Sequence, residues 1–239
     1  MIGLSYITQS KKRLISVEQL GKSGGEGSVY LCNNGFAIKV FNEKADIELK
    51  SKKIDSLISK KIFDKTFALP IEKVFLENGE FQGFLMNTAQ GETMQSCVFS
   101  RNGLLKKFPS WERINLANLA ITLLKKLQIL HNNKIIVGDI NPYNIMVKSD
   151  TELFFIDTDS FQVDDFLCTV GTDLFTAPEL QGADFKKTIR NIYNEQFSVA
   201  TLLFMIFLPG KNPFAYTGGG DLAKNIKDQN FSYPLGEDD

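Results

Sequence analysis

The chain has 239 residues, of which 43% are hydrophobic and 23% are charged, so it can bury a sizeable core as one large domain or as two lobes. Its 27 basic and 28 acidic residues give a net charge of −1, so no overall basic field points to nucleic acid or to an anionic membrane as a partner. One histidine and three scattered cysteines argue against a structural zinc site and indicate reduced thiols, hence a cytoplasmic protein.

No apolar run is long enough to predict a membrane span. The longest, residues 199–208, has about half of the ~20 apolar residues that a transmembrane helix needs, and we expect it to be a buried helix. Residues 1–14 contain no long apolar segment followed by a cleavage site, so a secretory signal is not expected.

Residues 14–41 are expected to form strands around a glycine-rich turn that contains Gly24, Gly25 and Gly27. Glycines let a backbone lie close over phosphates with its N–H groups exposed as donors, although a flexible hairpin turn is the simpler interpretation. A Walker A loop is excluded, because the glycine that it requires at position 16 is Ser16.

The next strand, residues 36–40, carries Lys39 among apolar side chains, where an unpaired ammonium group would be costly. Lys39 therefore either faces solvent from an edge strand or binds an anion, and its spacing after the glycine-rich turn favours the anion. Residues 43–61 are expected to form a charged amphipathic helix, and residues 70–74 and 80–86 to form two more strands.

In the C-terminal half, residues 111–132 have apolar side chains at helical spacing and predict a long helix. An apolar run then leads to Asp139, a proline-containing turn follows with Asn144, and a later strand ends at Asp157. These side chains suit phosphoryl transfer, in which one carboxylate orients the attacking hydroxyl while an amide and a second carboxylate hold Mg²⁺.

This order of motifs resembles that of the eukaryotic-type (Hanks-type) Ser/Thr protein kinases. The sequence D-x-x-P-x-N from Asp139 is similar to their catalytic loop, and residues 171–179 are similar to the G-T-x-x-[FY]-x-A-P-E end of their activation segment. Residues 195–200 and 210–214 are similar to two landmarks of the large lobe, so the resemblance covers roughly residues 14–235.

The resemblance implies an α+β, bilobal protein-kinase-like fold. Residues 1–90 would form the N-terminal lobe, an antiparallel β-sheet with one helix that binds the nucleotide, with the boundary near Gln90. Residues 91–239 would form a mainly helical C-terminal lobe that holds the catalytic loop and lacks the last helices of the family. The implied cofactors are ATP and Mg²⁺, and the implied acceptor is a protein, with no nucleic-acid partner.

The resemblance also implies roles for particular residues. Asp139 would be the catalytic base, with Asn141 beside it in the place of the usual lysine, and Asn144 and Asp157 would hold Mg²⁺. Lys39 would grip the α- and β-phosphates. The expected nucleotide-binding residues are Gly24, Gly25, Gly27, Val29, Ala37, Lys39, Glu48 and Met86.

Lys39 would also pair with an acidic residue of the following helix. Glu48 is the first candidate for this acid, and Glu43 and Asp55 are the alternatives. Residues 157–159 read Asp-Thr-Asp where the family has D-F-G, which keeps the metal ligand and is similar to a divergent bacterial group of kinase-like proteins.

Two alternatives to an active Ser/Thr kinase stay open. A pseudokinase, a nucleotide-binding scaffold, is favoured by the divergent glycine-rich turn and by Asn141. A small-molecule phosphotransferase is favoured by the pattern Gly-Asp-x-x-x-x-Asn without the lysine, but the complete activation segment argues against it.

Gly138 stands in place of the H-R-D arginine, so switching by a phosphate on the activation segment is not expected.

Overall fold

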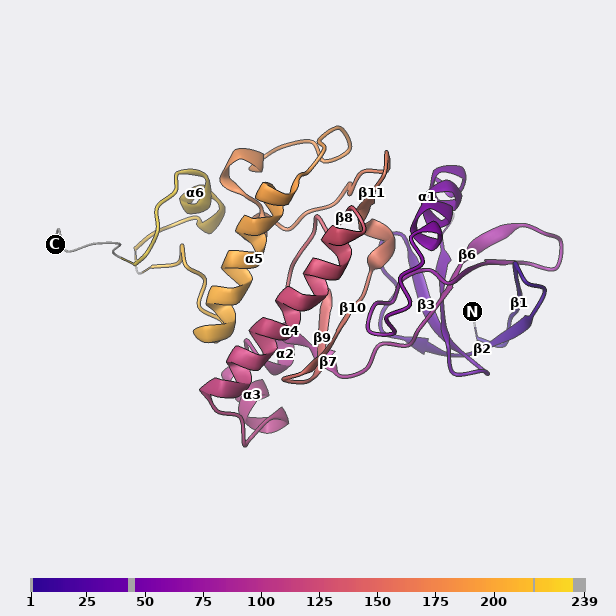
Figure 1. The fold of residues 1–239 in the computed structure, drawn as a ribbon, viewed down its shortest axis with the longest axis horizontal. Coiled ribbons are helices and arrows are strands. Elements are labelled where there is room, and N and C mark those ends of the chain that lie inside the picture. The colour runs from indigo at the N-terminus through magenta and orange to yellow at the C-terminus, as the bar shows by residue number, and fades with distance from the viewer. Residues whose placement is uncertain (1, 43–45, 217, 234–239) are drawn as a thin grey trace. The chain divides into compact units, whose positions relative to one another are not determined.

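The computed structural model describes residues 2–42, 46–216 and 218–233 (Figure 1). Its contacts divide the chain into two compact units. The first unit contains Met1–Ala89 with Phe155–Asp159, and the second contains Gln90–Phe154 with Ser160–Asp239. The predicted boundary near residue 90 came with a role for each part, nucleotide binding for the first and catalysis for the second. These roles stay predictions.

The first unit is built on a closed barrel of six antiparallel strands in the order β1-β2-β3-β4-β6-β5. Its core is formed by buried side chains that include Tyr6, Leu14, Ile38 and Val40. The strands are β1 (Ser5–Thr8), β2 (Arg13–Leu20), β3 (Gly27–Cys32), β4 (Ala37–Phe41), β5 (Glu72–Phe75) and β6 (Phe81–Met86).

The barrel contradicts the predicted bilobal kinase-like fold, which required an open antiparallel sheet in this part of the chain. The difference comes from β1, which pairs with β2 on one side and with β5 on the other and so closes the sheet. The predicted strands begin at residue 14, so β1, which lies before them at Ser5–Thr8, is the strand that the prediction lacks. The predicted strands at 36–40 and 80–86 are confirmed as β4 and β6.

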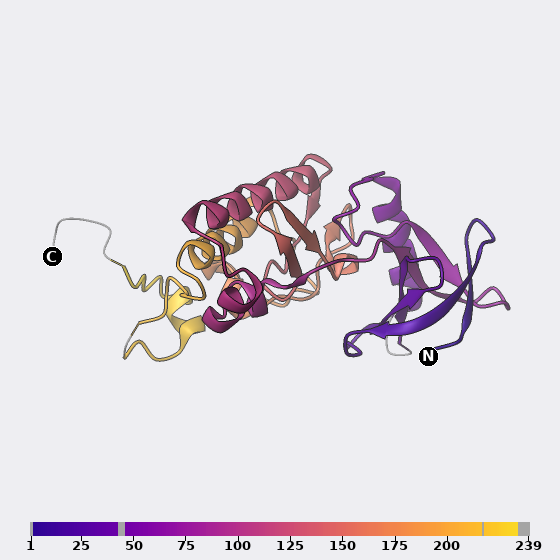
Figure 2. The ribbon, with the colours of Figure 1, turned by 90° about the horizontal axis from the view of Figure 1, so that it is seen from below.

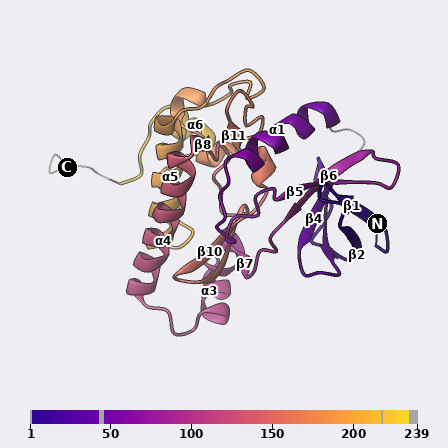
Figure 3. The same cartoon turned by 45° about the vertical axis from the view of Figure 1, so that its right-hand side comes forward.

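One helix, α1 (Ile47–Ser59), packs beside β5 and β6 of the barrel (Figure 3). It begins where the Asp46 side chain accepts a hydrogen bond from the Leu49 N–H, which satisfies a donor of the first turn. The helix predicted over 43–61 is thus confirmed for its described part, and residues 43–45 lie outside the described residues.

The second unit combines two long helices with two small sheets, in the strand orders β10-β9-β7 and β11-β8. The helices α4 (Arg113–Asn132) and α5 (Ile192–Phe207) pack side by side through buried leucines such as Leu123 and Leu202, as Figures 1 and 2 show. Both predicted helices are therefore confirmed. No described helix is long and apolar enough to cross a membrane.

The remaining elements of this unit are short strands, short helices and 3₁₀ turns. The strands and helices not yet placed are β7 (Glu92–Thr93), α2 (Met94–Cys97), α3 (Arg101–Lys107), β8 (Ile135–Ile136), β9 (Ile145–Ser149), β10 (Glu152–Phe155), β11 (Gln162–Val163) and α6 (Leu222–Lys227). Short 3₁₀ turns cover Thr158–Ser160, Asp173–Phe175 and Pro178–Leu180.

Candidate functional site

A chain of alternating charges crosses the first unit, and we call it the lysine–carboxylate network (Glu26, Lys39, Lys50, Asp157 and Asp159). The Lys39 ammonium group lies 2.5 Å from a carboxylate oxygen of Asp157 and 2.5 Å from one of Asp159. Lys50 of α1 lies 3.3 Å from the other oxygen of Asp159 and 2.5 Å from the Glu26 carboxylate. The network therefore joins the glycine-rich turn, β4, α1 and the Asp-Thr-Asp segment.

The Asp-Thr-Asp segment is tied to the barrel unit by its own backbone and side chains. The Thr158 hydroxyl donates to the Ala68 carbonyl at 2.7 Å, and the Ala68 N–H donates to the Phe155 carbonyl at 2.9 Å. Asp157 has φ of 56°, a left-handed conformation that is uncommon for a residue with a side chain. These contacts fix both aspartates against Lys39.

Burial and charge act in opposite directions within the network. Burial by itself would lower the pKa of Lys39, but the negative charges of Asp159 and Asp157 outweigh it and raise that pKa above its ordinary value. Burial by itself would raise the pKa of Asp159, but Lys39 and Lys50 outweigh it and hold that pKa below its ordinary value. Both groups are therefore charged at neutral pH.

The structure does not pair Lys39 with the expected acid of the following helix. Glu48 binds Lys52 one turn along the exposed side of α1, Asp55 binds Lys73, and Glu43 lies outside the described residues. The reason is helical phase: residues two apart, such as Glu48 and Lys50, face different sides of a helix, and Lys50 is the one directed at the network.

Asp159 takes the place that the sequence analysis gave to Glu48, and that analysis missed it. Its side chain is 0% exposed and binds both lysines. The available signal was the second aspartate of Asp-Thr-Asp, four residues after the end of β10, since an aspartate that is buried there needs a charged partner.

Four predicted nucleotide-binding residues share one face of the barrel wall. Val29 lies opposite Lys39 across β3 and β4, and Ala37 lies opposite Met86 across β4 and β6. Cross-strand partners point to the same side of a sheet, as do alternate residues of one strand. Ile38 points the other way, into the core of the barrel.

The glycine-rich turn joins β2 to β3, and its glycines have different structural reasons. A side chain at Gly27 would collide with the Val40 carbonyl of the neighbouring strand, so the sheet itself requires this glycine. A Cβ at Gly25 would meet no heavy atom within 4 Å, and one at Gly24 would meet only the Gly27 carbonyl at 3.6 Å. The fold alone therefore leaves Gly24 and Gly25 free to carry side chains.

The second unit holds the predicted base in a separate group of polar residues, which we call the Asp139 cluster (Asp139, Asn141, Asn144 and Thr172). The Thr172 hydroxyl donates to one carboxylate oxygen of Asp139 at 2.8 Å, and the Asn144 amide donates to the other at 3.2 Å. The predicted residues Asp139, Asn141 and Asn144 are thus neighbours, and Thr172, from the activation segment, was missed as a site residue.

Asn141 holds the loop of this cluster together and is 4% exposed. Its side-chain oxygen accepts from the backbone N–H groups of Tyr143 and Asn144, and its amide group donates to the Asp139 carbonyl and to the Thr172 hydroxyl, both at 3.3 Å. Position 141 therefore places a neutral, fully engaged side chain beside Asp139.

Buried side chains of other elements hold the loop that carries Asp139 and Asn141 in place. Glu195 of α5 accepts hydrogen bonds from the Gly138 N–H at 2.7 Å and contacts the His131 ring at 2.6 Å. The Arg190 guanidinium group fills the space beside Gly138, where it donates to the carbonyl groups of Cys168 and Val170. His131 therefore has a structural role here, because it contacts the carboxylate that holds the Gly138 N–H.

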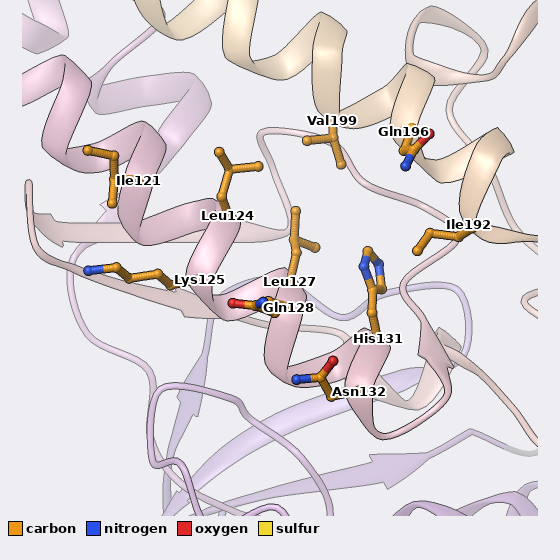
Figure 4. A pocket seen from close by; sticks show the side chains of 10 residues that line it. All are labelled: Ile121, Leu124, Lys125, Leu127, Gln128, His131, Asn132, Ile192, Gln196 and Val199. Atoms are coloured by element: carbon orange, nitrogen blue, oxygen red, sulfur yellow. The ribbon is translucent and has the colours of Figure 1, made fainter.

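His131 also lines a groove of about 540 Å³ between α4 and α5 (Figure 4). Half of the side chains that border the groove are apolar, among them Ile121, Leu124 and Val199. Asp139 and the other members of its cluster do not line it.

The two predicted magnesium ligands belong to different units, so their joint role stays a prediction. Their chemistry fits Mg²⁺, which prefers oxygen ligands. Asn144 uses its amide nitrogen on Asp139, which leaves its amide oxygen as the ligand atom, and the Asp157 side chain is 47% exposed. Within the part of the chain that the structure describes, no group of three or more His, Cys, Asp or Glu residues is arranged to hold a metal.

Comparison with known proteins gives a distant similarity to kinases. No family model matches the chain. The chain is 29% identical over 142 residues to Protein kinase YegI of Escherichia coli O157:H7 and, to the same extent, to Protein kinase YegI of Escherichia coli strain K12. The match covers 57% of this chain and 22% of each relative, so the chain spans about a fifth of their length. This similarity supports a kinase-like family and phosphoryl transfer in general.

Proposed function

We propose that this chain transfers a phosphoryl group from ATP to Ser or Thr hydroxyl groups of a protein, with Asp139 as the catalytic base. The observation that carries the proposal is the geometry of Asp139. One of its carboxylate oxygens accepts a hydrogen bond from the Thr172 hydroxyl at 2.8 Å, and Asn144 orients the other. A carboxylate held in this way can orient a hydroxyl group and accept its proton.

The first unit supplies the groups that would bind ATP. Lys39 is a buried cation, and a buried cation attracts the phosphate oxygens strongly because little water screens it. The face of the barrel wall that carries Lys39 also carries Val29, Ala37 and Met86, which offer apolar contacts for the adenine ring of ATP. The fold does not require glycine at positions 24 and 25. We therefore assign Gly24 and Gly25 to the nucleotide, because a turn without side chains can approach the phosphates closely.

Mg²⁺, when bound, would neutralise charge on the phosphates. Asn144 would offer its amide oxygen and Asp157 its half-exposed carboxylate as ligands. The acceptor stays general: a protein hydroxyl is the main proposal, and a small-molecule hydroxyl is the alternative.

A nucleotide-binding scaffold without transfer is the second candidate. It is favoured by Asn141, whose neutral side chain is fully engaged with the loop at the position of the family's lysine. Such a protein would bind ATP through Lys39 and would leave Asp139 without a chemical role.

The test compares ATP binding with phosphoryl transfer in three proteins. The wild type and Asp139→Asn are titrated with Mg-ATP by calorimetry, and label transfer to casein and to the chain itself is measured. Asp165→Asn, an exposed aspartate of the same unit, is the matched control. We expect Asp139→Asn to bind ATP like the wild type and to lose transfer by about 10²-fold to 10⁴-fold. Binding without transfer in the wild type would favour the scaffold.

A further inference from the structure

The lysine–carboxylate network has a buried middle and two half-exposed ends. The side chains of Lys39, Asp159 and Lys50 are 8%, 0% and 14% exposed, whereas those of Asp157 and Glu26 at the ends are 47% and 43% exposed. Water therefore competes for the end carboxylates, and the middle is protected from it.

Each lysine is shared between one buried and one half-exposed carboxylate. Asp159 binds both Lys39 and Lys50, Asp157 binds Lys39, and Glu26 binds Lys50. An incoming anion can replace an end carboxylate on its lysine, since that carboxylate can then return to water. Asp159 cannot be replaced so easily, because an unpaired carboxylate would remain buried.

Glu26 lies in the glycine-rich turn itself. Just after β4, Asn42 donates from its backbone N–H to the Glu26 carbonyl at 2.9 Å and from its side chain to the Gly25 carbonyl at 2.5 Å. These two hydrogen bonds bring the turn to the N-terminal end of α1, where the Glu26 carboxylate contacts Lys50. Lys50 is thus a cation within reach of the turn that the proposed function places over the phosphates.

We propose that Lys50 is a second phosphate-binding cation beside Lys39, that Asp159 positions both lysines, and that Glu26 occupies Lys50 until a nucleotide binds. This inference rests on the proposed function and assigns three further residues, Lys50, Asp159 and Glu26, to its nucleotide site. On binding, Lys50 exchanges the Glu26 carboxylate for a phosphate oxygen and keeps Asp159. The turn that carries Glu26 is released from α1 in the same step.

The first test titrates the full chain with ATP, ADP and adenosine by calorimetry. Lys50→Met should weaken ATP binding by about tenfold, the loss expected for one charge-assisted hydrogen bond, and should leave adenosine binding unchanged. Lys52→Met is the matched control, because Lys52 lies on the same helix, binds the exposed Glu48 and should change neither affinity. An unchanged ratio of ATP to adenosine affinity in Lys50→Met overturns the inference.

The second test removes the competitor and does not disturb a buried group. Glu26→Gln frees Lys50, so ATP should bind about twofold to fivefold more tightly, with adenosine binding unchanged. The double variant Glu26→Gln/Lys50→Met should lose this gain. Weaker ATP binding in Glu26→Gln, or a gain that persists in the double variant, overturns the inference, since Glu26 would then act only on the shape of the turn.

The two levels of the proposal fail in different ways. A wild type that binds neither ATP nor ADP rejects the proposed function and this inference together. A wild type that binds ATP with an affinity that does not respond to Lys50 or Glu26 rejects the inference alone and leaves the proposed function in place.

Discussion

Replacing Asp159 by asparagine should destabilise the first unit more than the same change at Asp157. Both carboxylates lie 2.5 Å from the Lys39 ammonium group, so the two variants break equally short contacts. They differ in burial, because the Asp159 side chain is 0% exposed and that of Asp157 is 47% exposed. Asp159 also binds Lys50, so the pair of variants compares a buried carboxylate that holds two lysines with a half-exposed carboxylate that holds Lys39.

The expected cost at Asp159 follows from what remains after the change. Breaking a buried ion pair by removing one partner costs ~3–5 kcal/mol, because the other charge stays buried. Lys39 keeps Asp157 and Lys50 keeps Glu26, so we expect a value near the lower end, about 3 kcal/mol in the free energy of unfolding. At Asp157 solvent screens the pair and Asp159 remains, so the cost should be about 1 kcal/mol or less.

Urea unfolding followed by circular dichroism measures both costs, with the exposed Asp165→Asn as the control for loss of a single charge. Calorimetry of the same variants locates the loss in one of the two units if they unfold separately. Equal costs at positions 157 and 159 would contradict this expectation, because neither the burial of Asp159 nor its second lysine would then contribute to stability.

Two further predictions concern pH and the glycine-rich turn. Because the pKa of Asp159 is lowered, its contribution to stability is present above the unfolded value of about 4 and is lost as the pH falls through the folded value. The difference in unfolding free energy between wild type and Asp159→Asn should thus be constant from about pH 5 to 8 and shrink towards pH 3; a constant difference down to pH 3 would contradict this. Gly27→Ala should lower the melting temperature, because the added Cβ collides with the Val40 carbonyl. Gly25→Ala should melt like the wild type but bind ATP more weakly. Unchanged ATP binding in Gly25→Ala would show that the turn does not approach the phosphates.

Local patterns predicted most of the secondary structure but not the closure of the barrel. Apolar periodicity located β4, α4 and α5, since each of these elements buries a regular set of side chains. The four residues of β1 have no such pattern of useful length, and their pairing with β5 joins segments far apart in the chain. Such long-range pairing is set by tertiary packing, which a local pattern does not record.

The candidate site divides in the same way. Asp139, Asn141 and Asn144 lie in one loop, so their spacing in the sequence already implied that they are neighbours. The partners of Lys39 are 118 and 120 residues away, and choosing them required the phase of α1 and the path of the Asp-Thr-Asp segment. Lys39 is thus buried and paired, but its acids come from the Asp-Thr-Asp segment and not from the helix that follows it in the sequence.

The most direct test of phosphoryl transfer counts products in the wild type. The chain is incubated with Mg-ATP and casein, and the ADP produced is compared with the phosphoserine and phosphothreonine formed on casein and on the chain itself. We expect one new phosphoester for each ADP, and about 10²-fold to 10⁴-fold less of both products with Asp139→Asn. ADP accompanied only by inorganic phosphate, or equal transfer by Asp139→Asn, would contradict the assignment of Asp139 as the base for a protein hydroxyl.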